Sequence, residues 1–187
     1  MRQLILIILA SSVLLLQACG GESHEHHAQE DVVTTETAQS QMNFSDAFKE
    51  SIEEVLDHYF SLSEALVQAD AENARVHAAA FAAKAAELSA DGDEGNFWSE
   101  KRSIISERSE TLVSLQDIEE QRYQFEYISA AMIETVKAAG PLSFTVYQQR
   151  CPMVRDGSAD WLSNDPAILN PYHGDRMLRC GSIVREI

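Results

Sequence analysis

Apolar residues recur every three or four positions over residues 44–69, which is the pattern of an amphipathic helix. The stripe consists of Phe48, Ile52, Val55, Tyr59, Leu62 and Leu66. A stripe with this spacing lies on one face of an α-helix and is normally buried against other elements. Ser45 or Asn43 can cap the helix, because their side-chain oxygens accept hydrogen bonds from first-turn N–H groups. We therefore expect a long helix that belongs to a bundle.

Residues 70–90 predict a second helix of a different kind, because they are rich in alanine. Alanine favours the helix and lets a neighbouring helix approach closely. Asp70 is a suitable N-cap and directly follows the first helix, so the two helices should form an antiparallel hairpin. Residues 90–95 read ADGDEG and interrupt the helical pattern, so we interpret them as a turn.

Two more helices are expected before residue 140. Asn96 can cap the third, whose polar middle at residues 100–110 places it on the surface. Ser114 and Asp117 are both candidate starts for the fourth, which spans about residues 118–139 and ends at Gly140-Pro141. Its expected stripe is Ile118, Phe125, Ile128, Met132 and Val136. Four helices joined by short turns predict an up-and-down four-helix bundle.

After Pro141 the helical periodicity gives way to short apolar runs that are partly β-branched. The runs lie at residues 142–146, 177–178 and 183–184. We expect them to form short strands or extended segments that pair with one another. Asp156-Gly157 is a turn signal, and residues 170–174, Asn-Pro-Tyr-His-Gly, are typical of a tight bend.

The fold class is therefore predicted to be mainly α. One domain of residues 44–187 would contain the four-helix bundle, and residues 141–187 would form a small irregular or β cap on it. The 187-residue length allows one domain plus tails.

Residues 1–18 are expected to be a signal peptide and not part of that domain. Arg2 precedes a mostly apolar run at residues 4–16, which is shorter than the roughly 20 residues of a membrane span. The run ends in Leu-Gln-Ala before Cys19, which resembles the lipobox of bacterial lipoproteins. Cys19 would then be the acylated N-terminus of a periplasmic, lipid-anchored protein, with Gly20 favouring the outer membrane. In the alternative, the signal is an ordinary secretory one and Cys19 is incidental.

Residues 19–43 are small and polar, and they are expected to form a flexible tether. The tether contains His24, His26 and His27, which form a weak secondary metal-binding tract or a linker without function.

The formal net charge of −16 excludes several partners. Nucleic-acid binding needs clustered Lys and Arg, and so does electrostatic docking to anionic lipid. Membrane attachment should therefore come from the acyl chains. The sequence also has no glycine-rich phosphate loop, no Gly-x-Ser-x-Gly and no HExxH motif, so we do not expect an enzyme.

The candidate chemistry lies in the cap, where Cys151 is close to Met153 and Cys180 is close to Met177. Thiolate and thioether sulfurs are soft donors that suit Cu(I) or Ag(I), and His173 could be an additional ligand. If Cys19 is lipidated, however, Cys151 and Cys180 are an isolated pair in an oxidising compartment, where disulfides persist. From the residues alone, the disulfide is the stronger of the two hypotheses.

Three motifs of the cap form a recognisable pattern. Cys-Pro-Met at residues 151–153 is followed by Trp-Leu-Ser at 161–163 and by NPYHGDRMLRCG at 170–181. This pattern resembles an uncharacterised bacterial domain that occurs alone in exported proteins. The same domain also occurs at the end of some periplasmic adaptor subunits of heavy-metal efflux systems. The resemblance extends into the helices and covers about residues 48–184.

The family that this pattern resembles has no settled activity, but its association with copper and silver efflux implies soft-metal binding. Matched to its motifs, the ligands would be Cys151, Met153, Met177 and Cys180. The resemblance makes metal binding the leading hypothesis, in sequestration or in delivery to an efflux system. A disulfide-stabilised structural or interaction module without metal is the alternative. Arg150 departs from the expected pattern and would place a cation beside the site.

Overall fold

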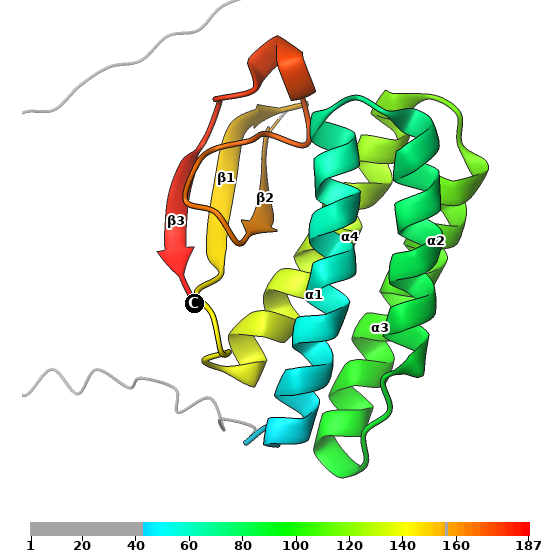
Figure 1. Ribbon diagram of the computed structural model, residues 1–187, viewed down its shortest axis with the longest axis vertical. Coiled ribbons are helices and arrows are strands. Elements are labelled where there is room, and N and C mark those ends of the chain that lie inside the picture. Colours follow the sequence, from blue (N-terminus) through cyan, green and yellow to red (C-terminus); the bar gives the residue numbers. More distant parts are fainter. Residues whose placement is uncertain (1–42, 156) are drawn as a thin grey trace, which may run out of the picture. The chain divides into compact units, whose positions relative to one another are not determined.

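Four helices are followed by a small three-stranded sheet, which confirms the predicted mainly-α bundle with a C-terminal β cap (Figure 1). The computed structural model describes residues 43–155 and 157–187. The helices are α1 (Asp46–Val67), α2 (Ala71–Glu87), α3 (Gly92–Ser114) and α4 (Ile118–Ala139). The cap contains β1 (Tyr147–Val154), β2 (Gly157–Ser163), the 3₁₀ helix η1 (Gly174–Met177) and β3 (Ser182–Glu186).

Several expectations for the N-terminal region lie outside the described residues. These are the signal peptide, the lipidation of Cys19, and the tether with His24, His26 and His27. Within residues 43–155 and 157–187, no helix combines the length and the apolarity that crossing a membrane requires.

Three of the four helices begin at the caps that the sequence predicts. The Ser45 hydroxyl accepts a hydrogen bond from the Phe48 N–H at 3.2 Å, and the Asp70 carboxylate accepts one from the Asn73 N–H at 3.0 Å. Asp117 accepts two, at 2.9 and 3.0 Å, from the first turn of α4. Each cap satisfies backbone donors that have no partner inside the helix.

The third helix differs from the prediction in its start and in its burial. It begins at Gly92, so most of the segment interpreted as a turn is the first turn of α3. A Cβ at Gly95 would lie 2.1 Å from the Ala90 carbonyl oxygen, so glycine permits this tight approach where another residue would not. The helix is also not merely a surface element, because three of its large apolar side chains are buried. They are Trp98, Ile105 and Leu112.

The hydrophobic core runs through the bundle and continues into the cap. All six residues of the predicted α1 stripe are buried, as are four of the five predicted for α4. Phe125 of α4 connects the two parts, because its ring lies 5.2 Å from that of Tyr59 and 5.9 Å from that of Tyr172. The cap is therefore held to the bundle by a shared core.

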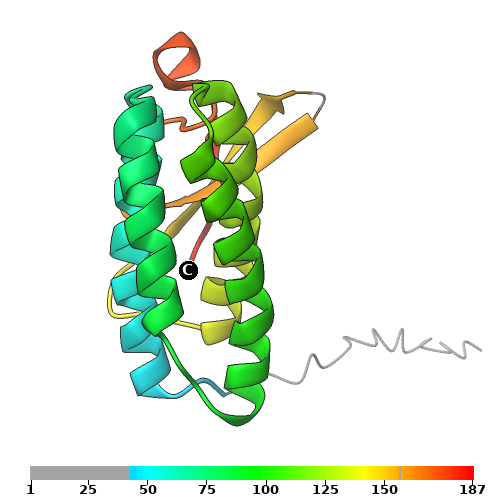
Figure 2. The ribbon, with the colours of Figure 1, turned by 90° about the vertical axis from the view of Figure 1, so that its right-hand side faces the viewer.

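The sheet is antiparallel, with the strand order β2-β1-β3. It lies on the side of the bundle formed by α1 and α4, and it is behind the bundle when viewed from α2 and α3 (Figures 1 and 2). Gln148 of the central strand pairs with Leu162 of β2 on one side and with Arg185 of β3 on the other. β3 returns from η1 to the free edge of β1, so the start of β3 lies opposite Arg150, next to the Cys-Pro-Met motif, and the end of the chain pairs with Val146 before β1.

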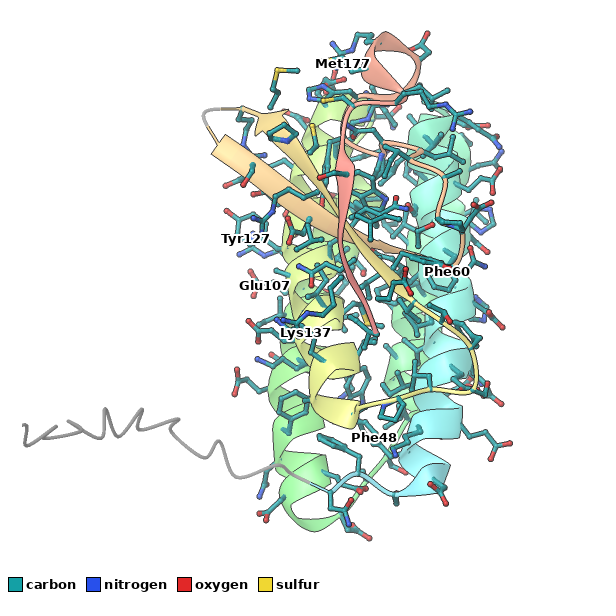
Figure 3. The ribbon with its side chains drawn as sticks, turned by 90° about the vertical axis from the view of Figure 1, so that its left-hand side faces the viewer. Phe48, Phe60, Glu107, Tyr127, Lys137 and Met177 are labelled. Carbon is teal, nitrogen blue, oxygen red and sulfur yellow. The ribbon has the colours of Figure 1, made fainter. Side chains whose placement is uncertain are left out.

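Of the three predicted runs, residues 183–184 lie in β3, and Val146 at the end of the first run exchanges backbone hydrogen bonds with Ile187. Residues 177–178 do not form a strand. The Cys-Pro-Met and Trp-Leu-Ser motifs themselves form β1 and β2, whereas Met177 lies in η1 (Figure 3). β1 lacks an apolar pattern because it contains two buried glutamines. Their side-chain N–H groups have hydrogen-bond partners, which allows them to be buried. Gln148 donates to the Asp160 carboxylate, and Gln149 donates to the Asp165 carbonyl at 3.0 Å. The predicted turn includes Asp156, which lies outside the described residues.

Candidate functional site

The two thiols of the cap lie side by side. Cys151 Sγ and Cys180 Sγ are 3.5 Å apart, and both cysteines are free. A disulfide would place them 2.03–2.05 Å apart, so this contact is one between two thiols. Cys151 is fully buried in β1, whereas Cys180 is half-buried in the segment before β3. The pair therefore consists of one fully buried and one half-buried cysteine.

The approach of Cys180 to Cys151 depends on the residue that follows it. β3 pairs with β1 up to Ser182, which lies opposite Arg150. Gly181 then turns the chain with a φ of +149°. A Cβ at Gly181 would lie 2.8 Å from the Arg150 carbonyl oxygen and 3.0 Å from the Trp161 indole. Glycine thus lets the backbone pass close to β1 and present the Cys180 thiol to Cys151.

Asn170 fixes the backbone of Cys180 and is a site residue that the sequence reasoning missed. Its buried side chain donates from Nδ2 to the Cys180 carbonyl at 2.8 Å and accepts from the Tyr172 N–H at 2.9 Å. The Cys180 N–H donates to the Met177 carbonyl at 2.9 Å. Both backbone groups of Cys180 are therefore bonded. The Asn-Pro-Tyr-His-Gly bend was a signal for Asn170, but only as a turn residue.

The predicted methionine and histidine ligands have different surroundings. Met153 is 51% exposed, whereas Met177 is partly buried at η1. His173 donates from Nε2 to the Met153 carbonyl at 2.8 Å, so this nitrogen is already engaged. Among the residues that the structure describes, no group of three or more His, Cys, Asp or Glu side chains could hold a metal ion. The structure thus brings the two thiols together, and the histidine supports the backbone of β1.

Arg150 precedes Cys151 in β1, and its positive charge is balanced by a carboxylate. Arg150 donates from Nε and Nη2 to the two oxygens of Asp160, at 2.6 and 3.0 Å. Such a two-pronged contact fixes the guanidinium plane against the carboxylate. Arg150 therefore has a partner of its own across the β1–β2 pair.

Two buried aromatic side chains, Trp161 and Tyr172, contact each other close to the segment that carries Cys180. Trp161 is 1% exposed and meets Tyr172 edge-to-face, with ring centroids 6.0 Å apart. The Tyr172 hydroxyl donates to the Asp160 carbonyl, and burial raises the pKa of Tyr172 well above its ordinary value. Tyr172 therefore stays protonated and donates its hydrogen bond throughout the physiological pH range.

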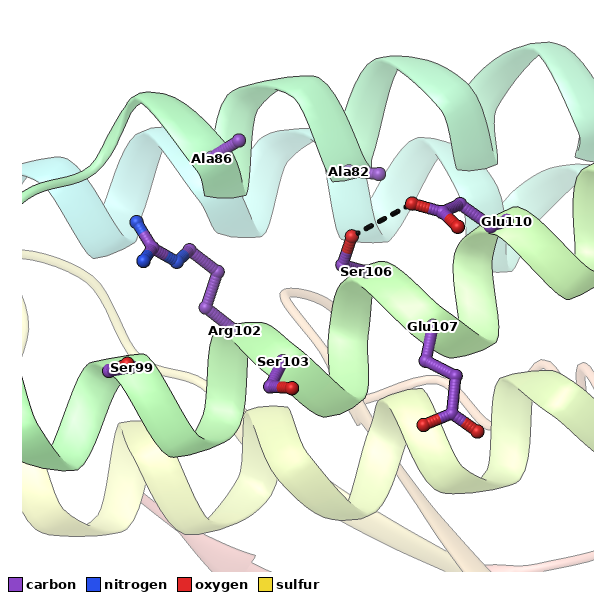
Figure 4. A pocket seen from close by; sticks show the side chains of 8 residues that line it. All are labelled: Ala82, Ala86, Ser99, Arg102, Ser103, Ser106, Glu107 and Glu110. Atoms are coloured by element: carbon purple, nitrogen blue, oxygen red, sulfur yellow. Dashed lines mark hydrogen bonds between the residues drawn. The ribbon is translucent and has the colours of Figure 1, made fainter.

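A separate hollow of about 510 Å³ lies between α2 and α3 (Figure 4). It is lined by Ala82, Ala86, Ser99, Arg102, Ser103, Ser106, Glu107 and Glu110. Ser106 donates to Glu110 at 3.1 Å across one helical turn. These side chains form an open groove between two helices and contain none of the predicted site residues.

The contact between the thiols should delay the ionisation of Cys180. The hydrogen bond with Cys151, followed by burial and then by the charge of Cys151, raises the pKa of Cys180 above its ordinary value. Because the thiolate is the reactive form, alkylation of Cys180 should reach its maximum rate only at unusually high pH. Cys151→Ala removes the partner and should shift this pH profile to lower pH.

The measurement is the rate of iodoacetamide alkylation at Cys180 across a pH series, followed by peptide mass spectrometry. A Cys19→Ser background removes the third cysteine. Identical pH profiles with and without Cys151 would show that the thiol contact has no such effect.

A match to a known protein family covers most of the helical bundle but neither Cys151 nor Cys180. The model of a family described as "Protein of unknown function (DUF3347)" matches residues 55–143, which include most of α1 and all of α2, α3 and α4. The match ends before Cys151. No curated protein and no solved structure matches the chain. The chain therefore contains an uncharacterised helical domain that is similar to a family of unknown function.

Proposed function

We propose that the domain binds a soft metal ion, Cu(I) or Ag(I), through the thiolates of Cys151 and Cys180. Met153 and Met177 would be thioether ligands or would support the site. The single observation that carries the proposal is the pair of free thiols 3.5 Å apart at the junction of β1 and β3. Soft sulfur donors prefer monovalent copper and silver over magnesium or calcium.

The spacing of the thiols is close to what one shared ion needs. Metal–thiolate bonds are about 2.3 Å long, so two sulfurs on one ion lie roughly 3.7–4.6 Å apart, depending on the angle at the metal. A sulfur separation of 3.5 Å therefore has to widen by about 0.2 Å for the most bent arrangement and by about 1.1 Å for a linear one. Asn170 bonds to the backbone carbonyl of Cys180, so the side chain of Cys180 remains able to turn toward an ion.

The charges around the pair also favour a cation. The chain has a formal net charge of −16, which attracts cations to its surface. Arg150 is the nearest positive charge in sequence, and the Asp160 carboxylate balances it. Two deprotonated thiols and a monovalent ion would leave a single negative charge in the site.

We further propose that the protein acts at the cell envelope, anchored to the membrane by acyl chains on Cys19. It would either sequester the ion or deliver it to a metal-efflux system. This part rests on two observations of the sequence, the lipobox-like segment and the resemblance of the cap motifs. A test is metabolic labelling with a palmitate analogue, which Cys19→Ala should abolish.

The metal proposal predicts that the thiols dominate affinity for Cu(I). The reduced chain, in a Cys19→Ser background with His24, His26 and His27 replaced by alanine, is titrated against a colorimetric Cu(I) chelator. Replacing Cys151 and Cys180 with serine should weaken binding at least about a hundredfold, because a hydroxyl is a poor ligand for a soft ion. Met153→Leu and Met177→Leu should each weaken it by roughly tenfold or less.

Met132→Leu is the matched control, because Met132 is a fully buried methionine in α4, on the bundle side of the core. It should leave the affinity unchanged. Cu(I) binding by the double serine variant that is as tight as that of the parent would rule out the thiol site.

The same geometry supports a second candidate, a disulfide-stabilised module without metal. The sulfurs need to approach by only about 1.5 Å to reach bonding distance. Closing the loop of about 30 residues between them would add roughly 3–4 kcal/mol of stability in the chain-entropy model. Thiol counting on protein isolated without reductant separates the candidates. A count of two free thiols would contradict the disulfide-stabilised module. A count of zero would contradict a resident metal site.

A further inference from the structure

We propose that the Cys151–Cys180 pair also performs thiol–disulfide exchange with disulfide-bearing molecules. Cys180 would be the thiol that enters the reaction, and Cys151 the thiol that resolves it. The proposal goes beyond metal binding and does not depend on it. It rests on the unequal exposure of two thiols in contact.

The burial of the two cysteines fixes the order in which they react. Cys151 is 0% exposed, and β1 holds it between β2 and the segment before β3. Cys180 is only half-buried. A disulfide must come into line with the attacking sulfur, which solvent exposure allows at Cys180 and burial prevents at Cys151. The substrate therefore meets Cys180 first.

The backbone around Cys180 is built to keep that sulfur beside its partner. The Cys180 carbonyl is held by Asn170, and its N–H is held by the Met177 carbonyl. Gly181 lies against the Arg150 carbonyl and Trp161, so the chain cannot carry the thiol far from β1. A mixed disulfide on Cys180 would thus form with Cys151 Sγ already within a few ångströms of the bond to be broken.

The proposed reaction has two displacements. Deprotonated Cys180 Sγ attacks one sulfur of a disulfide R–S–S–R, the S–S bond breaks, and one R–S⁻ leaves. Deprotonated Cys151 Sγ then attacks Cys180 Sγ, breaks the mixed disulfide and releases the second R–S⁻. The two protons lost by the cysteines are taken up by the two leaving thiolates. The cysteines are oxidised to a disulfide, and R–S–S–R is reduced to two R–SH.

Oxidised glutathione is the probe, added to the reduced, metal-free chain in a Cys19→Ser background with a chelator present. The parent should release two glutathione thiols per chain and form an internal disulfide. Cys151→Ser should stop at a stable mixed disulfide on Cys180. Cys180→Ser should react at least about tenfold more slowly than Cys151→Ser, because only the buried thiol remains.

Acid quenching of the parent at early times, followed by peptide mass spectrometry, tests the same order without any change to the thiol pair. Glutathione should be found on the peptide with Cys180. Glutathione on the Cys151 peptide first, equal rates for the two single variants, or a parent that stays in the mixed disulfide would each overturn the proposal. Because no metal is present, failure here leaves Cu(I) binding untouched, and failure of Cu(I) binding leaves this result standing.

Discussion

Replacing Phe125 with alanine should lower the free energy of unfolding by about 3–5 kcal/mol, the largest effect that we expect from a single substitution. Phe125 is 0% exposed, and its ring lies between those of Tyr59 in the bundle and Tyr172 in the cap. Removing it opens a cavity where the two parts of the core meet. Urea unfolding followed by circular dichroism measures the loss.

Two variants make this test specific. Phe125→Leu keeps much of the volume and should lose less than half as much stability as Phe125→Ala. Val76→Ala removes an apolar side chain that is 56% exposed on α2, so it should be nearly neutral. Equal losses for Phe125→Ala and Val76→Ala would mean that the core does not join cap and bundle in this way.

Gly181→Ala should lower the free energy of unfolding by about 1–3 kcal/mol and should also separate the thiols. The new Cβ would lie 2.8 Å from the Arg150 carbonyl and 3.0 Å from Trp161, in a backbone conformation with φ at +149°. The segment that carries Cys180 must shift to relieve this overlap. Internal disulfide formation with oxidised glutathione should then slow by about tenfold or more, since attack depends on the placement of the two sulfurs.

Gly157→Ala is the matched control within the same sheet. A Cβ at Gly157 meets no atom within 4 Å. This variant should keep both the stability and the rate of disulfide formation of the parent. If Gly181→Ala behaves like Gly157→Ala, the close passage at residue 181 does not position Cys180.

Much of the bundle could be predicted because helices are local structures. The stripe from Phe48 to Leu66 repeats at the helical period, and Ser45, Asp70 and Asp117 have the side chains that cap helices. Each of these signals lies within a few residues of the structure that it specifies. The start of α3 was missed because Gly92 and Gly95 are typical of turns. Gly95 is needed for its close contact with Ala90, which composition does not reveal.

The sheet could not be placed from the sequence because its pairings join residues that are far apart in the chain. β1 contains Gln148, Gln149 and Arg150, which lack the alternation of a half-buried strand. Their partners come from β2 and the following loop, and β3 pairs with β1 from more than 30 residues away. Polar residues become suitable for a buried strand only when those partners are in place.

The sequence by itself determined the mainly-α fold and singled out Cys151 and Cys180, since helical periodicity and residue chemistry are properties of short segments. Only the tertiary structure decided that the two sulfurs lie 3.5 Å apart, that Cys180 is the more exposed, and that His173 binds a carbonyl. It also assigned Asn170 and Gly181 to the site. Contact and burial depend on which surfaces the folded chain brings together, and local patterns of residues do not specify them.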